Sequence, residues 1–169
     1  MTLKPAKKTV AVVSNKAATN PVAHSLQGML KDTYALYLAT HNYHWNVEGS
    51  NFVALHTLFE QQYNELFAAI DTLAERIRAL DVYALPNHYE EVLETFLSLP
   101  NPLSKSEDKA DVAENMVRNL LDLNGKVVDS AQTAKKAAEK AGDDETVDMM
   151  VERILVHQKA SWMLRSIIK

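Results

Sequence analysis

Two histidines and two acidic residues in the first half of the chain have side chains of the kind that bind transition metals. His44 and His56 carry imidazoles, and Asp71 and Glu75 carry carboxylates. Imidazole and carboxylate together suit iron, zinc and manganese. On a helix, Asp71 and Glu75 leave the same face, and their like charges repel unless a cation neutralises them. The pattern therefore indicates a candidate metal site. The alternative is that each residue is an ordinary polar group at the edge of a core or on the surface.

The spacing along one helix prevents these residues from binding a single metal ion within one chain. His56 precedes Asp71 by 15 residues, which is about 22 Å along a helix. If this helix packs antiparallel against a second copy of itself, His56 of one chain meets Asp71 and Glu75 of the other, and the contact occurs twice by symmetry. His44 lies a short loop before His56 and can join it. Glu60, one turn after His56, can supply a further oxygen.

The sequence gives less support for metal binding by the other four histidines. His41 shares a helix face with His44 and is a candidate for an additional ligand. His157 lies on the apolar face of the last predicted helix, so we expect it to be buried and hydrogen-bonded. His24 and His88 are expected at the surface. The Glu-x-x-His signature of di-iron bundles is absent from the sequence.

Helix signals place the histidines and carboxylates on the first two of four long helices. Asn20 is expected to cap the first helix, with Pro21 at its first position. This helix runs to about Val47, and a second runs from about Asn51 to Leu80. Apolar residues recur along both at spacings of three and four, as an amphipathic helix requires.

The second half of the chain predicts a short helix followed by two long ones. The short amphipathic segment covers about Tyr89–Leu97, and Ser104–Glu107 resembles a capping box for the third long helix. Gly142 ends that helix, Asp143 caps the last, and Gly125 marks a bend or a close packing. The fold class is therefore all-α: a four-helix bundle with a short extra helix in the crossover between helices two and three.

The composition excludes several classes of protein. The chain has 169 residues, of which 47% are apolar and 24% charged, as in a single globular domain. The absence of cysteine excludes disulfides, thiolate metal sites and cysteine nucleophiles. No apolar run reaches the ~18 residues that a membrane span needs, and residues 1–19 lack the apolar core of a signal peptide. We expect a soluble cytoplasmic protein that does not contact membranes.

Positive charge is concentrated at the N-terminus. Residues 1–23 carry +4 and no acid, whereas the other 146 hold 14 basic and 22 acidic side chains, giving −8. Residues 1–19 are interpreted as a mobile basic tail and residues 20–169 as the bundle domain. Such a tail either binds DNA phosphates without sequence preference or only keeps the chain in solution. Its lysines are Lys4, Lys7, Lys8 and Lys16.

Several segments taken together resemble the Dps family of ferritin-like proteins. They are the run His41-Asn-Tyr-His-Trp-Asn-Val-Glu-Gly49, then Phe52, Leu55-His56, Phe59-Glu60 and Tyr63, and finally Asp71-x-x-Ala-Glu75-Arg-Ile-Arg78. Over the first two predicted helices the likeness holds residue by residue. Beyond Leu80 it lies only in the order of elements, a short helix in the crossover and then two long helices. One departure is Asp81, at a position where the family commonly has glycine.

The resemblance implies a ferritin-like bundle that assembles into a hollow shell of twelve chains. Such shells oxidise Fe(II), preferentially with hydrogen peroxide, store ferric mineral and protect DNA from oxidative damage. The ferroxidase ligands carried over are His44 and His56 from one chain and Asp71 and Glu75 from its two-fold partner, with zinc as a substitute for iron. Glu60 matches an acid that assists a second iron or mineral growth.

Two further features are interpreted through the same resemblance. Trp45 follows the first ligand; it packs beside the site and intercepts radicals, or else it is plain core packing. An acidic run opens the last helix, where it complements the helix dipole or lines a pore that draws Fe(II) inward. That run comprises Asp143, Asp144, Glu145 and Asp148. DNA binding through the tail would associate the shell with the nucleoid.

Overall fold

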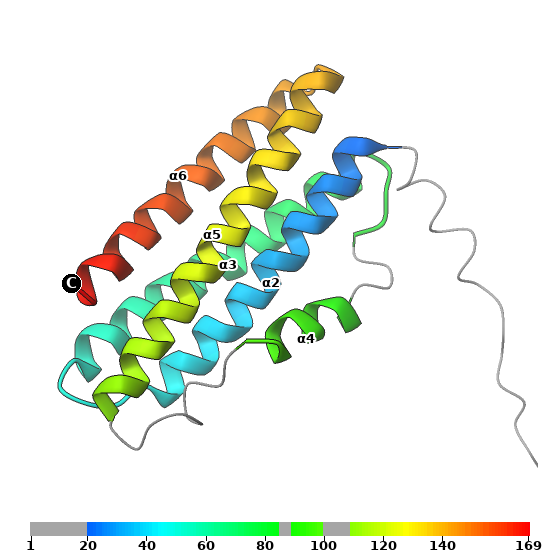
Figure 1. Ribbon diagram of the computed structural model, residues 1–169. Helices are drawn as coiled ribbons and strands as arrows, with labels where there is room; N and C mark the ends of the chain where they lie inside the picture. The colour runs from blue at the N-terminus through cyan, green and yellow to red at the C-terminus, as the bar shows by residue number, and fades with distance from the viewer. Residues whose placement is uncertain (1–19, 85–88, 100–108) are drawn as a thin grey trace, which may run out of the picture.

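The computed structural model of the chain describes residues 20–84, 89–99 and 109–169, and in these ranges it contains five helices and no strand. The helices are α2 (Pro21–Asn46), α3 (Phe52–Ala79), α4 (Tyr89–Leu97), α5 (Lys109–Ala141) and α6 (Asp144–Ile167). Four long helices lie side by side in a bundle, and α4 lies outside it against α2 (Figure 1). The all-α fold class is therefore confirmed.

The direction of the helices explains the long crossover. α2 and α3 form one antiparallel pair, and α5 and α6 form a second (Figure 1). α3 and α5 run in the same direction, so α5 begins at the opposite end of the bundle from the end of α3. The crossover between them contains α4, as the sequence predicts.

Local signals at the helix ends are confirmed where the structure describes them. The Asn20 side chain accepts the backbone N–H of Ala23 at 3.1 Å, and the Asp143 side chain accepts that of Thr146 at 3.0 Å. Gly142, before the second cap, has a φ of 69°, a conformation that favours glycine. The predicted capping box at 104–107 and His88 lie outside the described residues.

The core fills the space between the four long helices. Its largest fully buried side chains include Leu26, Phe59, Leu73 and Leu120. Gly125 does not contribute a close contact, because a Cβ added there would meet nothing within 4 Å. The predicted close packing at this glycine is wrong. Over the described ranges, no helix combines the length and the apolarity that a bilayer crossing requires.

The turn after α3 contains an unusual backbone conformation. Among the described non-glycine residues, Asp81 alone has a positive φ, at 60°. Aspartate tolerates this left-handed conformation better than most residues, and glycine tolerates it best. The departure from glycine at Asp81 therefore affects the geometry of a helix end, far along α3 from the histidines.

Candidate metal centre

His44 and His56 meet where α2 ends and α3 begins. The connection between these helices turns at Gly49, whose φ is 102°, a conformation that glycine adopts without strain. The two imidazole rings stack with their centroids 3.8 Å apart and an interplanar angle of 22°. His44 is buried and His56 is half-buried. The fold thus places the two predicted imidazole ligands directly against each other.

The two histidines bind each other's backbone. His44 Nδ1 lies 2.9 Å from the carbonyl oxygen of His56, and His56 Nδ1 lies 2.8 Å from the carbonyl oxygen of His44. A carbonyl oxygen only accepts hydrogen bonds, so each Nδ1 must carry the proton. Each Nε2 then holds a lone pair, and neither has a hydrogen-bond partner among the described residues. Fixing the tautomer through the second ring nitrogen is the arrangement that protein metal sites use.

Aromatic rings surround the pair. The Tyr63 ring packs edge-on against His44, with a centroid distance of 5.2 Å, and the Phe52 ring lies 5.0 Å from His56. His41 contacts Tyr63 at 4.4 Å and Trp45 at 4.1 Å. Trp45 is 64% exposed, so its interpretation as core packing is wrong within the chain. His41 thus lies among tilted aromatic rings and is not part of the His44–His56 stack.

The carboxylates of the predicted site lie elsewhere on the same chain. Asp71 and Glu75 are exposed on α3, 15 residues or more beyond His56 and therefore about 22 Å or more along the helix. Glu60 is also exposed. Within the described ranges, no group of three or more histidines, aspartates and glutamates of one chain could hold a metal ion. A single chain thus supplies a pair of imidazoles without the carboxylates.

The acidic run at the start of α6 is divided between two environments. Asp143 accepts a hydrogen bond from Arg76 at 2.6 Å and one from the Thr146 hydroxyl at 2.8 Å. Burial raises the pKa of the Asp143 carboxyl, but the bonds from Thr146 and the charge of Arg76 outweigh this effect and lower it. Asp144, Glu145 and Asp148 are exposed. Only these three point their charges to solvent in the isolated chain.

His157 belongs to a different kind of cluster, which the sequence predicted only in part. As expected, it is buried, with 1% of its surface exposed, and hydrogen-bonded. Its Nδ1–H donates to Asn124 Oδ1 at 2.9 Å, and Arg153 Nη2 donates to its Nε2 at 3.0 Å. Arg153 also forms a bidentate ion pair with Glu65, in which Nη1 and Nη2 each donate to one carboxylate oxygen. Burial and the neighbouring Arg153 charge lower the pKa of His157 to about 3, so its imidazole stays neutral.

Arg153 was missed by reasoning from the sequence. Its spacing of four residues from His157 places both on one face of α6, which was the available signal. Both ring nitrogens of His157 are engaged, so this histidine has no lone pair to offer a metal.

Similarity to known proteins identifies the family. The family profile described as the Ferritin-like domain matches residues 23–169. A protein from Brevibacillus brevis named DNA protection during starvation protein is 30% identical over 148 residues, which cover 88% of this chain and 95% of the relative. The crystal structure of Dps from Staphylococcus aureus is 31% identical, with a TM-score of 0.75 over 88% of this chain and 95% of that one. The chain belongs to the Dps family of ferritin-like proteins.

Membership of the Dps family also accounts for the architecture. Dps from Thermosynechococcus elongatus superimposes with a TM-score of 0.77 over 92% of this chain and 95% of that one, at 26% identity. A general role in iron storage and DNA protection follows from the family. The lysines predicted to bind DNA lie at positions 4–16, outside the described residues.

Proposed function

We propose that this Dps-family protein is a ferroxidase whose site is completed by two chains. His44 and His56 of one chain would bind Fe(II) through Nε2, and Asp71 and Glu75 of a two-fold partner would supply the oxygens. The observation that supports this most strongly is the reciprocal bonding of the two Nδ1 atoms, which leaves two adjacent Nε2 lone pairs. Packing two copies of α3 antiparallel would bring the missing carboxylates to this pair.

The ligand set suits oxidation of the bound metal rather than a closed structural site. Two neutral imidazoles and two carboxylates balance the charge of one Fe(II) and leave coordination positions open. With hydrogen peroxide as oxidant, two Fe(II) ions each lose one electron. The O–O bond breaks, and two protons complete two molecules of water. Using both electrons at one site avoids release of a hydroxyl radical.

Other residues have supporting roles in this proposal. Glu60 would hold a second, weaker iron near His56, and zinc could occupy the main site without being oxidised. Trp45, which is exposed and contacts the His41 ring, would intercept radicals formed nearby. Asp144, Glu145 and Asp148 would attract Fe(II) toward a pore of a twelve-chain shell in the cytoplasm. Asp143 is already engaged by Arg76 and Thr146 and contributes less to such a pore.

Fe(II) oxidation in a double variant tests the assignment. We expect His56→Ala with Asp71→Ala to lose peroxide-driven oxidation of Fe(II), followed by absorbance of the ferric product, while the assembled mass is retained. His24→Ala with Asp122→Ala is the matched control, because both of those residues are exposed and lie outside the proposed site. Unchanged oxidation in the first double variant would refute the ligand assignment.

A second function rests on the charge of the N-terminal segment. We propose that residues 1–19 bind DNA through phosphate contacts, because this segment is basic and the rest of the chain is acidic. Several such tails on one particle would add avidity to weak individual contacts. Deleting residues 1–19 should abolish the DNA gel shift and leave ferroxidase activity unchanged. The full-length shift should weaken steeply between low and moderate salt. Equal binding by both proteins would show that the segment is only a solubilising extension.

A further inference from the structure

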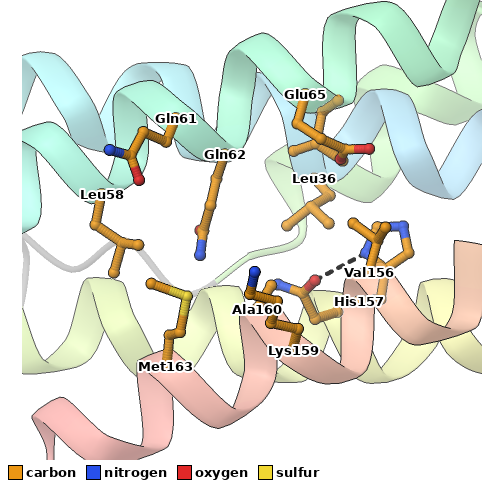
Figure 2. A pocket seen from close by; sticks show the side chains of 12 residues that line it. Leu36, Leu58, Gln61, Gln62, Glu65, Val156, His157, Lys159, Ala160 and Met163 are labelled. Carbon is orange, nitrogen blue, oxygen red and sulfur yellow. Dashed lines mark hydrogen bonds between the residues drawn. The ribbon is translucent and has the colours of Figure 1, made fainter.

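A pocket lies between the first half of α3 and the second half of α6, and Leu36 of α2 and Asn124 of α5 complete its lining. Its volume is about 180 Å³, somewhat larger than a cavity of about 150 Å³ that binds benzene. Apolar atoms make up most of its surface, and its six apolar residues come from α2, α3 and α6 (Figure 2). The apolar residues are Leu36, Leu58, Leu66, Val156, Ala160 and Met163.

Polar groups without partners gather around this pocket. Within the described ranges, two buried side-chain nitrogen or oxygen atoms have no hydrogen-bond partner, Gln62 Nε2 and Arg153 Nε. Figure 2 shows the Gln62 side chain reaching from α3 into the space toward α6. Arg153 is bonded to Glu65 and His157, which both line the pocket. Because buried donors are almost always satisfied, an unpaired donor facing a cavity indicates a missing acceptor.

We propose that the pocket binds a small, uncharged, mostly apolar molecule with one hydrogen-bond acceptor, the size of an aromatic ketone. Its apolar body would cover the leucines and Met163, and its acceptor would take the hydrogen bond from Gln62 Nε2. This site goes beyond the proposed ferroxidase and uses none of its ligands.

The surroundings favour this class of ligand over water or an ion. A buried water needs two to four polar partners, and three of the polar residues in the lining, Glu65, Asn124 and His157, already bond to Arg153 or to one another. An anion would gain little from Arg153, whose charge Glu65 already balances, or from His157, which is neutral. A cation would meet donors rather than acceptors at Gln62. The remaining combination is an apolar body with an uncharged acceptor.

Saturation-transfer NMR on the full-length protein tests the proposal with two probes of similar shape. Acetophenone has a carbonyl acceptor, and ethylbenzene has none. We expect saturable binding of both, with acetophenone bound about two- to tenfold more tightly, the range expected for one net hydrogen bond. Gln62→Leu keeps the volume and removes the donor, so it should abolish the preference for the ketone.

Two variants separate binding in the pocket from binding elsewhere. Ala160→Leu and the bulkier Ala160→Phe should fill the pocket and displace both probes, with helix content checked by circular dichroism. Gln158→Leu, on the same helix but exposed and outside the pocket, should leave both affinities unchanged. Absence of saturable binding to the wild-type protein, equal binding of the two probes, or retained binding when the pocket is filled would each overturn the proposal.

Discussion

The two histidine clusters of this protein use the same side chain in opposite ways. His44 and His56 each use one ring nitrogen in a hydrogen bond to a backbone carbonyl, and the other ring nitrogen stays available. In His157 both ring nitrogens are hydrogen-bonded, one to Asn124 and one to Arg153. The first cluster lies at a helix junction next to exposed aromatic rings, whereas the second joins side chains of α3, α5 and α6.

This difference separates a histidine that can bind a ligand from one that holds the fold together. Burial by itself does not distinguish them, because His44 is buried as well. The distinguishing property is whether every donor and acceptor on the ring is already satisfied. An imidazole with a fixed tautomer and an unused lone pair is prepared for a metal, while a fully bonded, neutral imidazole contributes to stability.

The largest expected effect is a separation of metal binding from stability between the clusters. His56→Leu should lower Fe(II) affinity at least about tenfold and change the free energy of unfolding by less than ~1 kcal/mol. His157→Leu should leave Fe(II) affinity within twofold but lower the free energy of unfolding by about 3 kcal/mol, because Arg153 and Asn124 lose buried partners. Titration calorimetry and chemical denaturation measure the two quantities. If both variants changed Fe(II) affinity and the free energy of unfolding in the same way, the proposed difference between the two clusters would be wrong.

The free energy of unfolding should also depend on pH through His157, the fully bonded histidine of the second cluster. The pKa of His157 is about 3 in the folded chain and about 6.5 when unfolded. Between these values the unfolded state binds more protons, so stability falls as the pH is lowered. From pH 7 to pH 5 this histidine should remove about 2 kcal/mol from the free energy of unfolding.

His157→Gln supplies the control for this pH effect. Without the imidazole, the loss of stability between pH 7 and pH 5 should be smaller by about 2 kcal/mol. Identical pH profiles for the wild-type protein and this variant would mean that His157 is protonated in the fold.

A smaller effect is expected at the polar cluster where Arg76 meets the start of α6. Asp143 is fully bonded, as His157 is, but it lies nearer the surface and caps a helix. Asp143→Ala should lower the free energy of unfolding by about 1–2 kcal/mol at pH 7. Because the pKa of Asp143 is lowered in the fold, its contribution is present above its unfolded pKa of about 4 and is lost below it. Asp144→Ala, one residue on and exposed, should cost about 0.5 kcal/mol or less.

The helices could be predicted from the sequence because their signals are local. The caps at Asn20 and Asp143, and the limits of the short helix at Tyr89–Leu97, depend on residues within one or two turns. The burial of His157 also followed from its apolar neighbours on one helix face. Of the two interpretations of Gly125, a bend or a close packing, the close packing was wrong, because the space around a helical glycine depends on the neighbouring helices.

Much of the candidate site could not be predicted because its bonds join distant residues. The bonds between His44 and His56 cross a loop that separates them by 12 positions, and Glu65 and Arg153 are 88 positions apart. The sequence allows Trp45 either to pack beside the metal site or to lie in the core, and only the folded chain shows that it is exposed. Asp71 and Glu75 are the extreme case, since their proposed partners lie on another chain.

Co-assembly of two inactive variants tests most directly whether the metal site is shared between chains. One variant lacks His44 and His56, and the other lacks Asp71 and Glu75. In a mixed dimer, one site loses all four ligands and the other keeps all four, so random pairing should restore about a quarter of the wild-type sites. Peroxide-driven Fe(II) oxidation should return to about that level in mixed shells and stay absent in shells of either variant alone. Mixed shells that form correctly, as judged by mass, but remain inactive would contradict a site built from two chains.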